Sequence, residues 1–565
     1  MAIGIVVVAV GGVGLIVVLS GGPSQKDTAT SFARAWSAGD YAAMRAQTTG
    51  AVQDRYSARA FAARYAAAGS TATATKVVPG TPRDDGDGHW ELPVTVNTRA
   101  FGPVSGTVRF DVVKDGDDQR IDWKANDVFP GLAAGETLRR TTTMPERADL
   151  LARDGTPLAQ GPNRTSPLGA TAKAIVGALG PIPASYAAKA QELGYPADAQ
   201  VGITGLERAF DERLAGTPGG ELRAGVRLLA SRAPRKAAPV RTTIAPKVEE
   251  AAVTALAGRL GGVVALRPKT GEILAAAGIG FSGLQPPGST FKIITATGVL
   301  EHGVAKPSDT FPVQTAATLE GVDLQNANGE SCGGTLAQSF ANSCNSVFAP
   351  LGAKLGAQKL VETAEAFGFN KPTGITGAAT ASIPPAGEIG DDLAVGSSAI
   401  GQGRVQATAL QMAIVAASIG LRGRRPDVTL DPDQFKGDAP THQATTSRVA
   451  RQVEKFMLDV VRYGTGKVAA IPDVKVAGKT GTAELKSTQT CPPADGQTPT
   501  TGGSETCDPD QQADTSDTDA WFASYAPAGN GTPRIAVGVL LVGAGAGGDT
   551  AAPAARQVLL AGLKG

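Results

Sequence analysis

The chain has 565 residues, of which 42% are hydrophobic and 19% charged, a composition typical of a globular protein with several domains and not of a disordered chain. Its formal net charge of +1 leaves no basic surface for nucleic acid, so we expect no nucleic-acid partner. The four cysteines and three histidines lack the spacing of zinc ligands, so we expect neither a metal site nor another cofactor.

Residues 1–22 form an apolar segment without charge that is about as long as a helix crossing a bilayer. No Ala-x-Ala-like cleavage site follows it, and it holds no cysteine that could accept a lipid. We expect an uncleaved membrane anchor, with a cleaved signal as the alternative. Flanking lysines and arginines are missing, so charge does not set the orientation of this anchor.

The next segment, 24–140, combines one helical pattern with several strand patterns. DTATSFARAWSAGDYAAMRA predicts a helix with Phe32 and Trp36 on one face and a turn at Gly39-Asp40. HWELPVTVNT, SGTVRFDVVKD and QRIDWKAND alternate polar and apolar residues and predict strands, with KDGDD as a hairpin turn. A helix followed by a curved antiparallel sheet resembles the nuclear-transport-factor-like extension of some penicillin-binding proteins, an α+β cone-like domain. In that resemblance DWKANDVFPGLAAGETL is the closing strand.

The segment 145–240 contains ERADLLARDGTPLAQ and VGITGLERAFDERLAGTPGG, and both resemble the pedestal (dimerisation) domain of class B penicillin-binding proteins. The basic, proline-spaced SRAPRKAAPV then indicates a linker. TTIAPKVEEAAVTALAG predicts the helix that opens a last domain, 242–565. We expect this last domain to carry the chemistry.

Lys-Thr-Gly occurs twice in the last domain. The first copy, 269–271, lies between the apolar runs 263–266 and 273–277, which predicts a turn with a solvated Lys269. The second copy, Lys479 to Gly481, follows an alternating run that predicts a strand. A phosphate-binding loop is excluded there, because Asp473 stands where such a loop needs its first glycine.

Ser289 and Lys292 lie three positions apart in QPPGSTFKIITATGVLEHG, at the predicted start of a helix and therefore on one face. The free N–H groups and positive dipole of a helix start lower the pKa of a nearby lysine, so a neutral Lys292 could take the proton of Ser289. Alone, this spacing is far more often that of a capped helix with an exposed lysine. No histidine has a catalytic neighbourhood, which excludes a serine–histidine triad.

Ser343-Cys344-Asn345 and Lys479-Thr480-Gly481-Thr482 complete an ordered set of Ser-x-x-Lys, Ser-x-Asn and Lys-Thr-Gly. This set is similar to that of the penicillin-binding proteins and serine β-lactamases. With the pedestal, it resembles a class B penicillin-binding protein of actinobacterial type. The resemblance implies that the last domain has the transpeptidase fold, an antiparallel sheet flanked by helices.

The resemblance also implies a role for each motif residue. Ser289 attacks the carbonyl of the penultimate D-alanine of a peptidoglycan stem peptide, and Lys292 is the base. Ser343 relays a proton to the leaving group, while Asn345 binds the substrate amide and Lys292. The substrate-binding residues are Lys479, Thr480 and Thr482, which hold the terminal carboxylate, and Gly481, which leaves room for the substrate backbone. The backbone N–H groups of Ser289 and Thr482 form the oxyanion hole.

The function implied by this resemblance is that of a membrane-anchored D,D-transpeptidase that is acylated by β-lactam antibiotics, with its catalytic domain outside the cell. Its partners would be peptidoglycan stem peptides and a membrane glycan polymerase of the elongation or division machinery. Two alternatives stay open: a β-lactamase, which needs a further base to activate water, and a non-catalytic β-lactam sensor or scaffold.

The cysteines are expected to form two local disulfides, Cys332 with Cys344 and Cys491 with Cys507, because an oxidising exterior and short separations favour small loops. The alternative is four free thiols. Cys344 is interpreted as a disulfide partner and not as a second nucleophile. GQGRVQATALQMA, from Gly401 to Ala413, resembles a family loop near the site, but we favour a glycine-bent packing segment over a chemical role.

Overall fold

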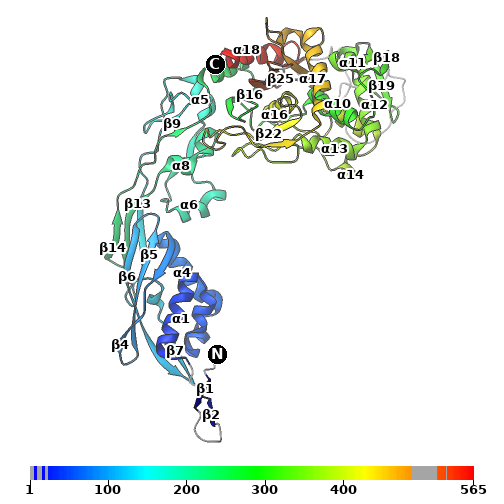
Figure 1. Ribbon diagram of the computed structural model, residues 1–565. Helices are drawn as coiled ribbons and strands as arrows, with labels where there is room; N and C mark the ends of the chain where they lie inside the picture. The colour runs from blue at the N-terminus through cyan, green and yellow to red at the C-terminus, as the bar shows by residue number, and fades with distance from the viewer. Residues whose placement is uncertain (1–4, 9–14, 19–22, 485–517, 530, 565) are drawn as a thin grey trace, which may run out of the picture. The chain divides into compact units, whose positions relative to one another are not determined.

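The computed structural model describes residues 5–8, 15–18, 23–484, 518–529 and 531–564 (Figure 1). Its internal contacts divide the chain into two compact units. The first comprises Met1–Ala148, Leu179–Ile203 and Asp211–Ala238, and the second comprises Asp149–Ala178, Thr204–Phe210 and Pro239–Gly565. Both units mix helices and strands, which confirms the predicted multidomain α+β class. The predicted pedestal segment, 145–240, contributes to both units.

The apolar N-terminal segment is a strand pair where the structure describes it. β1 (Ile5–Val8) pairs antiparallel with β2 (Leu15–Val18). Runs of valine and isoleucine have a high strand propensity, which is the local reason for this pairing. Within the described residues no helix is long and apolar enough to span a bilayer, and the rest of the predicted anchor, 1–22, lies outside them.

The first unit begins with the predicted amphipathic helix, α1 (Gln25–Ala38). Ser24 and Asp27 cap its first turn reciprocally, and Gly39 ends it with a φ of 70°. Phe32 and Trp36 are buried on the predicted face and belong to the core of this unit. The other helices of the unit are α2 (Tyr41–Ala46), α3 (Gly50–Arg55), α4 (Ala58–Ala72), α6 (Ala187–Leu193) and α8 (Asp211–Ala215).

The predicted strands form one antiparallel sheet in the order β3-β5-β6-β7, with β4 paired to β5. Every second side chain of β5 is buried, as its alternating sequence predicts. The predicted hairpin turn joins β6 to β7. The strands are β3 (Ala74–Pro79), β4 (Arg83–Gly86), β5 (His89–Thr98), β6 (Gly102–Asp115) and β7 (Asp118–Asp122).

The predicted closing strand over 122–138 is wrong. A 3-10 helix, η1 (Ala125–Val128), and turns occupy this stretch. The Asp127 carboxylate accepts the backbone N–H of Lys124 at 2.7 Å, and such side-chain bonds to the backbone compete with strand pairing. Further strands of the unit form two separate sheets: β8 (Leu138–Thr143) with β13 (Gly219–Ala224) and β14 (Arg227–Arg232), and β11 (Leu179–Pro181) with β12 (Gln200–Gly202).

The second unit is built on a five-stranded antiparallel sheet in the order β17-β16-β26-β25-β24. Its strands are β16 (Gly261–Leu266), β17 (Ile273–Gly278), β24 (Ala477–Glu484), β25 (Thr518–Ala526) and β26 (Ile535–Leu541). α9 (Pro246–Leu256), the predicted opening helix, packs with α18 (Ala551–Lys564) on one face. The wholly buried α16 (Ala409–Gly420) covers the other face, where Gly538 lets it approach β26 closely.

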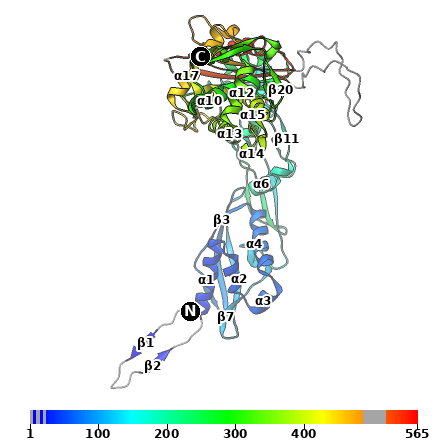
Figure 2. The same ribbon diagram turned by 90° about the vertical axis from the view of Figure 1, so that its right-hand side faces the viewer.

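A group of helices, several of which Figure 2 labels close together, carries two of the three motifs, and α17 of this group contacts β24. These helices are α10 (Lys292–Glu301), α11 (Leu336–Ala341), α12 (Asn345–Leu355), α13 (Ala357–Ala366), α14 (Ala386–Ile389), α15 (Asp392–Ala399) and α17 (Ser447–Arg462). Short strand pairs complete the unit: β18 (Thr310–Gln314) with β21 (Cys332–Thr335), β19 (Ala316–Leu319) with β20 (Val322–Gln325), and β22 (Arg424–Pro426) with β23 (Thr441–Gln443). The unit also contains β9 (Leu150–Leu151), β10 (Pro157–Ala159), β15 (Val240–Arg241), α5 (Ala170–Val176) and α7 (Gly205–Ala209).

A buried carboxyl group ties α9 to the far edge of the main sheet. One oxygen of Glu249 accepts the backbone N–H of Ala276 in β17 at 2.8 Å, and the other has no hydrogen-bond partner among the described residues. Burial raises the pKa of Glu249 to about 7, because a charged carboxylate is poorly solvated there. The bond from Ala276 offsets only part of this effect.

This raised pKa predicts that Glu249→Gln stabilises the second unit at alkaline pH. Folding favours the protonated acid, so the wild type loses stability as the pH rises from the unfolded pKa through about 7, and the variant does not. We expect little gain near pH 4.5 and a gain of about 3 kcal/mol at pH 8. Thermal unfolding measured across this range checks the prediction. The control is Glu250→Gln, because Glu250 is exposed. A difference in stability between Glu249→Gln and wild type that does not change with pH would contradict the prediction.

Candidate active site

Ser289 and Lys292 lie at the turn that leads into α10. Gly288–Phe291 form a 3-10 turn, η3, and the α-helix starts at Lys292 itself, so the predicted helix start is tighter than expected. The Nζ atom of Lys292 donates to the Ser289 hydroxyl oxygen at 3.0 Å. Lys292 is fully buried, whereas Ser289 is half-buried. The structure therefore places the predicted base in direct contact with the predicted nucleophile.

The Ser-x-Asn motif lies between α11 and α12 and completes the surroundings of Lys292. Its Nζ donates to the backbone oxygen of Ser343 at 2.7 Å and to Oδ1 of Asn345 at 2.6 Å. Asn345 is held in place because its Nδ2 donates to the Gln325 oxygen at 2.7 Å. Ser343 has a φ of 63°, a left-handed conformation that is uncommon for a residue with a side chain. This backbone turn directs both the oxygen and the hydroxyl of Ser343 to the lysines.

The second Lys-Thr-Gly copy lies on β24, at the edge of the main sheet, as predicted. Lys479 is fully buried, and its Nζ donates to the Ser343 hydroxyl at 2.8 Å and to the Thr480 oxygen at 2.9 Å. Ser343 Oγ also lies 3.4 Å from Lys292 Nζ. The three motifs thus form one chain of contacts that runs from Lys479 through Ser343 and Lys292 to Ser289.

The two lysines are buried without an acidic partner among the described residues. Burial lowers the pKa of Lys292 well below its usual value, and the charge of nearby Lys479 lowers it further. Burial lowers the pKa of Lys479 to about 7. The rings of Phe348 and Phe340 lie 5.8 Å and 5.6 Å from the Nζ atoms of Lys292 and Lys479. Both effects favour the neutral form of Lys292, which is the form that can accept a proton.

Glycines bring the strand and the serine turn together. A Cβ atom on Gly481 would lie 2.7 Å from the Pro287 oxygen, and one on Gly288 would lie 2.6 Å from the Thr482 oxygen. A Cβ atom on Gly401 would lie 2.0 Å from the Gly288 oxygen. Gly401 therefore packs closely against the serine turn, as the interpretation of its segment as a glycine-bent packing segment describes. Side chains at Gly288 or Gly481 would push β24 away from the Ser289 turn.

The motif threonines differ in their surroundings. Thr480 is only 5% exposed, and its hydroxyl lies 2.6 Å from that of Thr465. Thr482 is half-buried, and its hydroxyl accepts the Gly547 N–H at 3.4 Å. Thr465 is exposed, and its backbone N–H donates to the Ala341 oxygen at 3.1 Å. Sequence reasoning missed Thr465, because a threonine between two glycines after α17 gives no signal without the fold.

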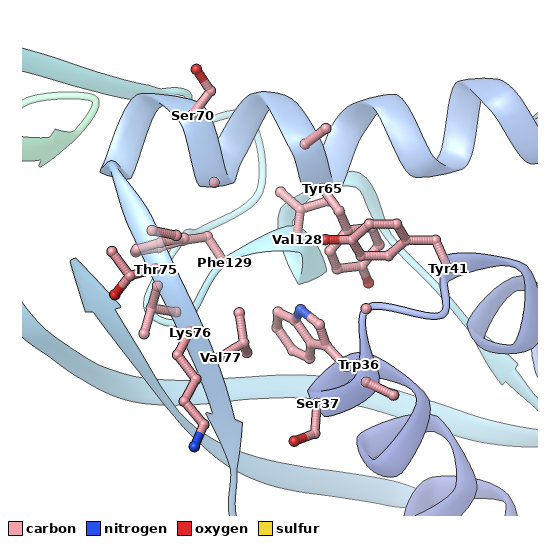
Figure 3. A pocket seen from close by; sticks show the side chains of 16 residues that line it. Trp36, Ser37, Tyr41, Tyr65, Ser70, Thr75, Lys76, Val77, Val128 and Phe129 are labelled. Atoms are coloured by element: carbon pink, nitrogen blue, oxygen red, sulfur yellow. The ribbon is translucent and has the colours of Figure 1, made fainter. Parts of the chain in front are cut away.

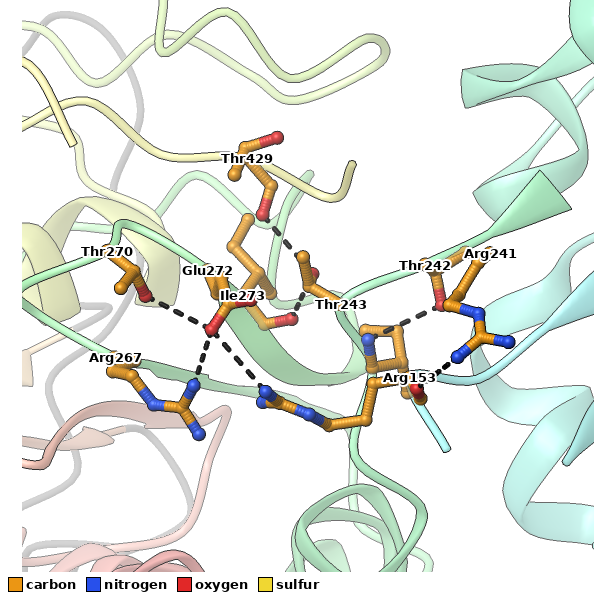
Figure 4. Close-up of polar contacts among 10 residues, drawn as sticks. Arg153, Arg241, Thr242, Thr243, Arg267, Thr270, Glu272, Ile273 and Thr429 are labelled. Atoms are coloured by element: carbon orange, nitrogen blue, oxygen red, sulfur yellow. Dashed lines mark hydrogen bonds and ion pairs between the residues drawn. The ribbon is translucent and has the colours of Figure 1, made fainter. Parts of the chain in front are cut away.

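The first Lys-Thr-Gly copy is a turn remote from this network, between β16 and β17. Lys269 is exposed and lies 3.5 Å from the Asp438 carboxylate. Thr270 donates to Glu272 at 3.1 Å, and the same carboxylate pairs with Arg267 at 2.6 Å and Arg153 at 3.6 Å (Figure 4). Its residues therefore stabilise a turn and a surface ion-pair cluster.

The cysteine next to Ser343 is oxidised. Cys332, at the start of β21, forms a disulfide with Cys344, which precedes α12. Cys491 and Cys507 lie outside the described residues. Within the described part of the chain, no group of three or more His, Cys, Asp or Glu side chains could hold a metal ion.

Three family models match the chain in order. They are the NTF2-like N-terminal transpeptidase domain over residues 24–136, the penicillin-binding protein dimerisation domain over 153–225 and the penicillin-binding protein transpeptidase domain over 261–560. The last of these matches more than half of the chain. It also contains all three motifs whose side chains meet at Ser343.

Individual proteins agree with these models. A peptidoglycan D,D-transpeptidase, PbpA of Mycolicibacterium smegmatis, is 32% identical over 422 residues, which cover 64% of this chain and 80% of that protein. The crystal structure of PBPA from Mycobacterium tuberculosis is 26% identical with a TM-score of 0.56, covering 74% of this chain and 99% of that one. Its penicillin G acyl-enzyme complex has the same identity and coverage and a TM-score of 0.54. This chain therefore belongs to the penicillin-binding protein transpeptidase family, as a class B member with an NTF2-like N-terminal domain.

Proposed function

We propose that this protein is a peptidoglycan D,D-transpeptidase that cross-links stem peptides through an acyl-enzyme on Ser289, and that β-lactams acylate the same serine. The observation that carries the proposal is the contact between Lys292 Nζ and Ser289 Oγ, 3.0 Å apart, in a site whose burial lowers the pKa of the lysine. A relative of the same family has been crystallised as a penicillin G acyl-enzyme, which supports the covalent step.

In the proposed reaction, Ser289 Oγ attacks the carbonyl carbon of the penultimate D-alanine while its proton passes to Lys292 Nζ. The charge on the substrate oxygen is met by backbone N–H groups of the Ser289 turn and of β24, which the glycines at 288 and 481 bring close together. The bond to the terminal D-alanine then breaks, and its amine takes a proton through the Ser343 hydroxyl. An amine of a second stem peptide attacks the ester and restores Ser289.

The terminal carboxylate of the donor peptide is assigned to the β24 side of the site. Lys479 supplies the charge, and the Thr482 hydroxyl is the half-buried motif group. Thr480 is almost fully buried, and the hydroxyl of the exposed residue Thr465 lies beside it. Thr465 therefore adds a hydroxyl on the solvent side of the carboxylate-binding residues. We infer that Thr465 contacts the carboxylate together with the motif residues.

Hydrolysis as the main activity is less well supported. A β-lactamase needs a base that activates water for deacylation. Among the described residues, no Asp or Glu side chain hydrogen-bonds Ser289, Lys292, Ser343 or Asn345. A sensor without catalysis is also less well supported, because the complete chain of contacts from Lys479 to Ser289 is in place.

We further propose that residues 1–22 anchor the protein in the cell membrane with the catalytic unit outside the cell. The apolar composition of this segment supports the anchor. We propose a membrane glycan polymerase as the partner that supplies the strands, since none of the three matched domains is a polymerase domain.

The nucleophile is tested by Ser289→Ala, which should abolish covalent labelling by a fluorescent penicillin while circular dichroism stays unchanged. Ser343→Ala should slow labelling and leave the attachment site intact, because Ser343 only relays protons. Gel fluorescence followed over hours measures both effects. An adduct mapped by peptide digestion to Ser343 would refute the assignment, and rapid loss of label from the wild type would indicate a β-lactamase.

The two Lys-Thr-Gly copies should respond differently to mutation. Lys479→Ala removes the charge that meets the ligand carboxylate and should lower the second-order acylation rate constant about 100-fold. Lys269→Ala removes only a surface contact with Asp438 and should leave the constant unchanged. Stopped-flow acylation measures both constants, and equal effects would contradict the separation of strand and turn.

Thr465 is tested by removing only its hydroxyl. Thr465→Val should lower the acylation rate constant about tenfold, because a hydrogen bond to a charged group is lost. Thr465→Ser keeps the hydroxyl and should retain most of the rate. A full rate in the valine variant, or an equal loss in both variants, would show that Thr465 does not contact the ligand.

A further inference from the structure

The first unit contains a cavity of about 450 Å³ that includes none of the motif residues (Figure 3). Its aromatic rings pack against each other, with the ring centroids of Tyr41 and Tyr65 5.2 Å apart, so they complete the core of this unit. The second unit, by contrast, holds a buried polar side chain beside the acylation site that the proposed reaction does not use. This residue is Asn326, which lies between β20 and η4 (Ala327–Gly329) and is only 5% exposed.

The amide group of Asn326 is hydrogen-bonded to the backbone of three separate segments. An asparagine amide offers two N–H donors and an oxygen acceptor. Nδ2 donates to the Gln314 oxygen at 2.8 Å and to the Glu330 oxygen at 2.9 Å, and Oδ1 accepts the N–H of Ser346 at 2.9 Å. These bonds fix the backbone at Asn326, because its movement would leave polar groups without partners.

The bond to Ser346 supplies a cap for α12. The first N–H groups of a helix have no partner within the helix, and a side chain usually caps them. The side chain of the N-cap residue, Cys344, accepts none of them, and its sulfur is part of the disulfide. Asn326 takes this task from another segment of the chain. It therefore attaches the end of β20 to the start of α12.

This attachment places Gln325 against the Ser-x-Asn motif. The Gln325 oxygen accepts Nδ2 of Asn345 at 2.7 Å, so two consecutive residues after β20 begins to end bind two consecutive residues of α12. A carbonyl oxygen can accept only from the nitrogen end of the Asn345 amide. The Oδ1 atom of Asn345 is therefore turned to Lys292, which donates to it from Nζ at 2.6 Å.

This orientation decides what Asn345 can offer to a ligand. Within the described residues Nδ2 of Asn345 makes one hydrogen bond, to Gln325, and so keeps a second N–H for a ligand. The motif resemblance gives Asn345 the substrate amide as its ligand, and the oxygen of that amide can accept this N–H. In a turned Asn345 amide, two oxygens would face each other at Gln325, and the bond to Lys292 would be lost.

We propose that Asn326 is a positioning residue for acylation, which holds Gln325 against Asn345 and thereby directs Asn345 to Lys292 and to the substrate amide. The contact between Asn345 and the ligand in this step rests on the proposed function. A purely structural Asn326 would affect stability and would affect all ligands equally. A positioning residue matters most for the ligands that carry the amide.

Two β-lactams separate these roles. Penicillin G carries an acylamino group in the place of the substrate amide, whereas imipenem carries a hydroxyethyl group there. Asn326→Ala should lower the second-order acylation rate constant of penicillin G about tenfold, because a hydrogen bond to the ligand is lost. The constant of imipenem should fall at most about threefold, since Lys292 keeps its bond to the Ser343 oxygen. Stopped-flow acylation of the full-length protein in detergent measures both constants.

Asn326→Ser is the milder change and should show the same preference with a smaller loss. The matched control is Thr243→Ala, because Thr243 is also buried and its hydroxyl binds backbone oxygens of Ile273 and Thr429, outside the motifs. We expect this control to lower the melting temperature, as Asn326→Ala does, and to leave both rate constants unchanged.

A double-mutant cycle shows whether Asn326 acts through Asn345. Asn345→Ala removes the amide that Asn326 directs, so adding Asn326→Ala should lower penicillin G acylation by less than about twofold further. Additive losses, equal losses for the two β-lactams in Asn326→Ala, or an unchanged penicillin G constant would each overturn this inference alone. No acylation of the wild type by either β-lactam would refute the proposed function and this inference with it.

Discussion

The burial of two lysines around one serine hydroxyl is the constraint on which the catalytic unit depends. Lys292 and Lys479 are both 0% exposed, and Ser343 lies within hydrogen-bonding distance of each. Burial and the charge of the neighbouring lysine both disfavour two charged ammonium groups here, so the site favours the loss of a proton. The fold meets this requirement by supplying neutral acceptors, the Ser343 and Thr480 oxygens and the Asn345 amide, in place of carboxylates.

The segment that carries Ser343 is held from several sides, as its left-handed backbone requires. The Cys332–Cys344 disulfide fixes the next residue to β21, and the Thr465 N–H binds the Ala341 oxygen two residues earlier. The buried Nζ atom of Lys292 donates to the backbone oxygen of Ser343. Strained backbone persists where the surroundings determine it in this way, and here the strain directs the hydroxyl between the lysines.

Sequence reasoning located the chemistry because motif spacing encodes it. The strand at Lys479 and the turn at Lys269 follow from local alternation and turn residues, and the structure has both. The role of Thr465 could not be predicted, because its contact with Thr480 depends on how α17 packs against β24. The strand expected over 122–138 failed for a local reason, since the Asp127 bond to the backbone of Lys124 was not recognised. The division of the pedestal between two units depends on contacts that no local pattern encodes.

The two lysines can take opposite protonation states when substrate arrives. The pKa of Lys479 is about 7 in the free site, so an approaching carboxylate favours its charged form and raises that pKa. The charge gained by Lys479 acts on Lys292, whose pKa is lowered by burial and by this same neighbour. Substrate binding would thus keep the proposed base neutral at the moment when Ser289 must lose its proton. When the pKa values of two neighbouring titratable groups differ strongly, one group can act as a base while the other stays charged. Here the substrate carboxylate would increase the difference between the pKa values of Lys292 and Lys479.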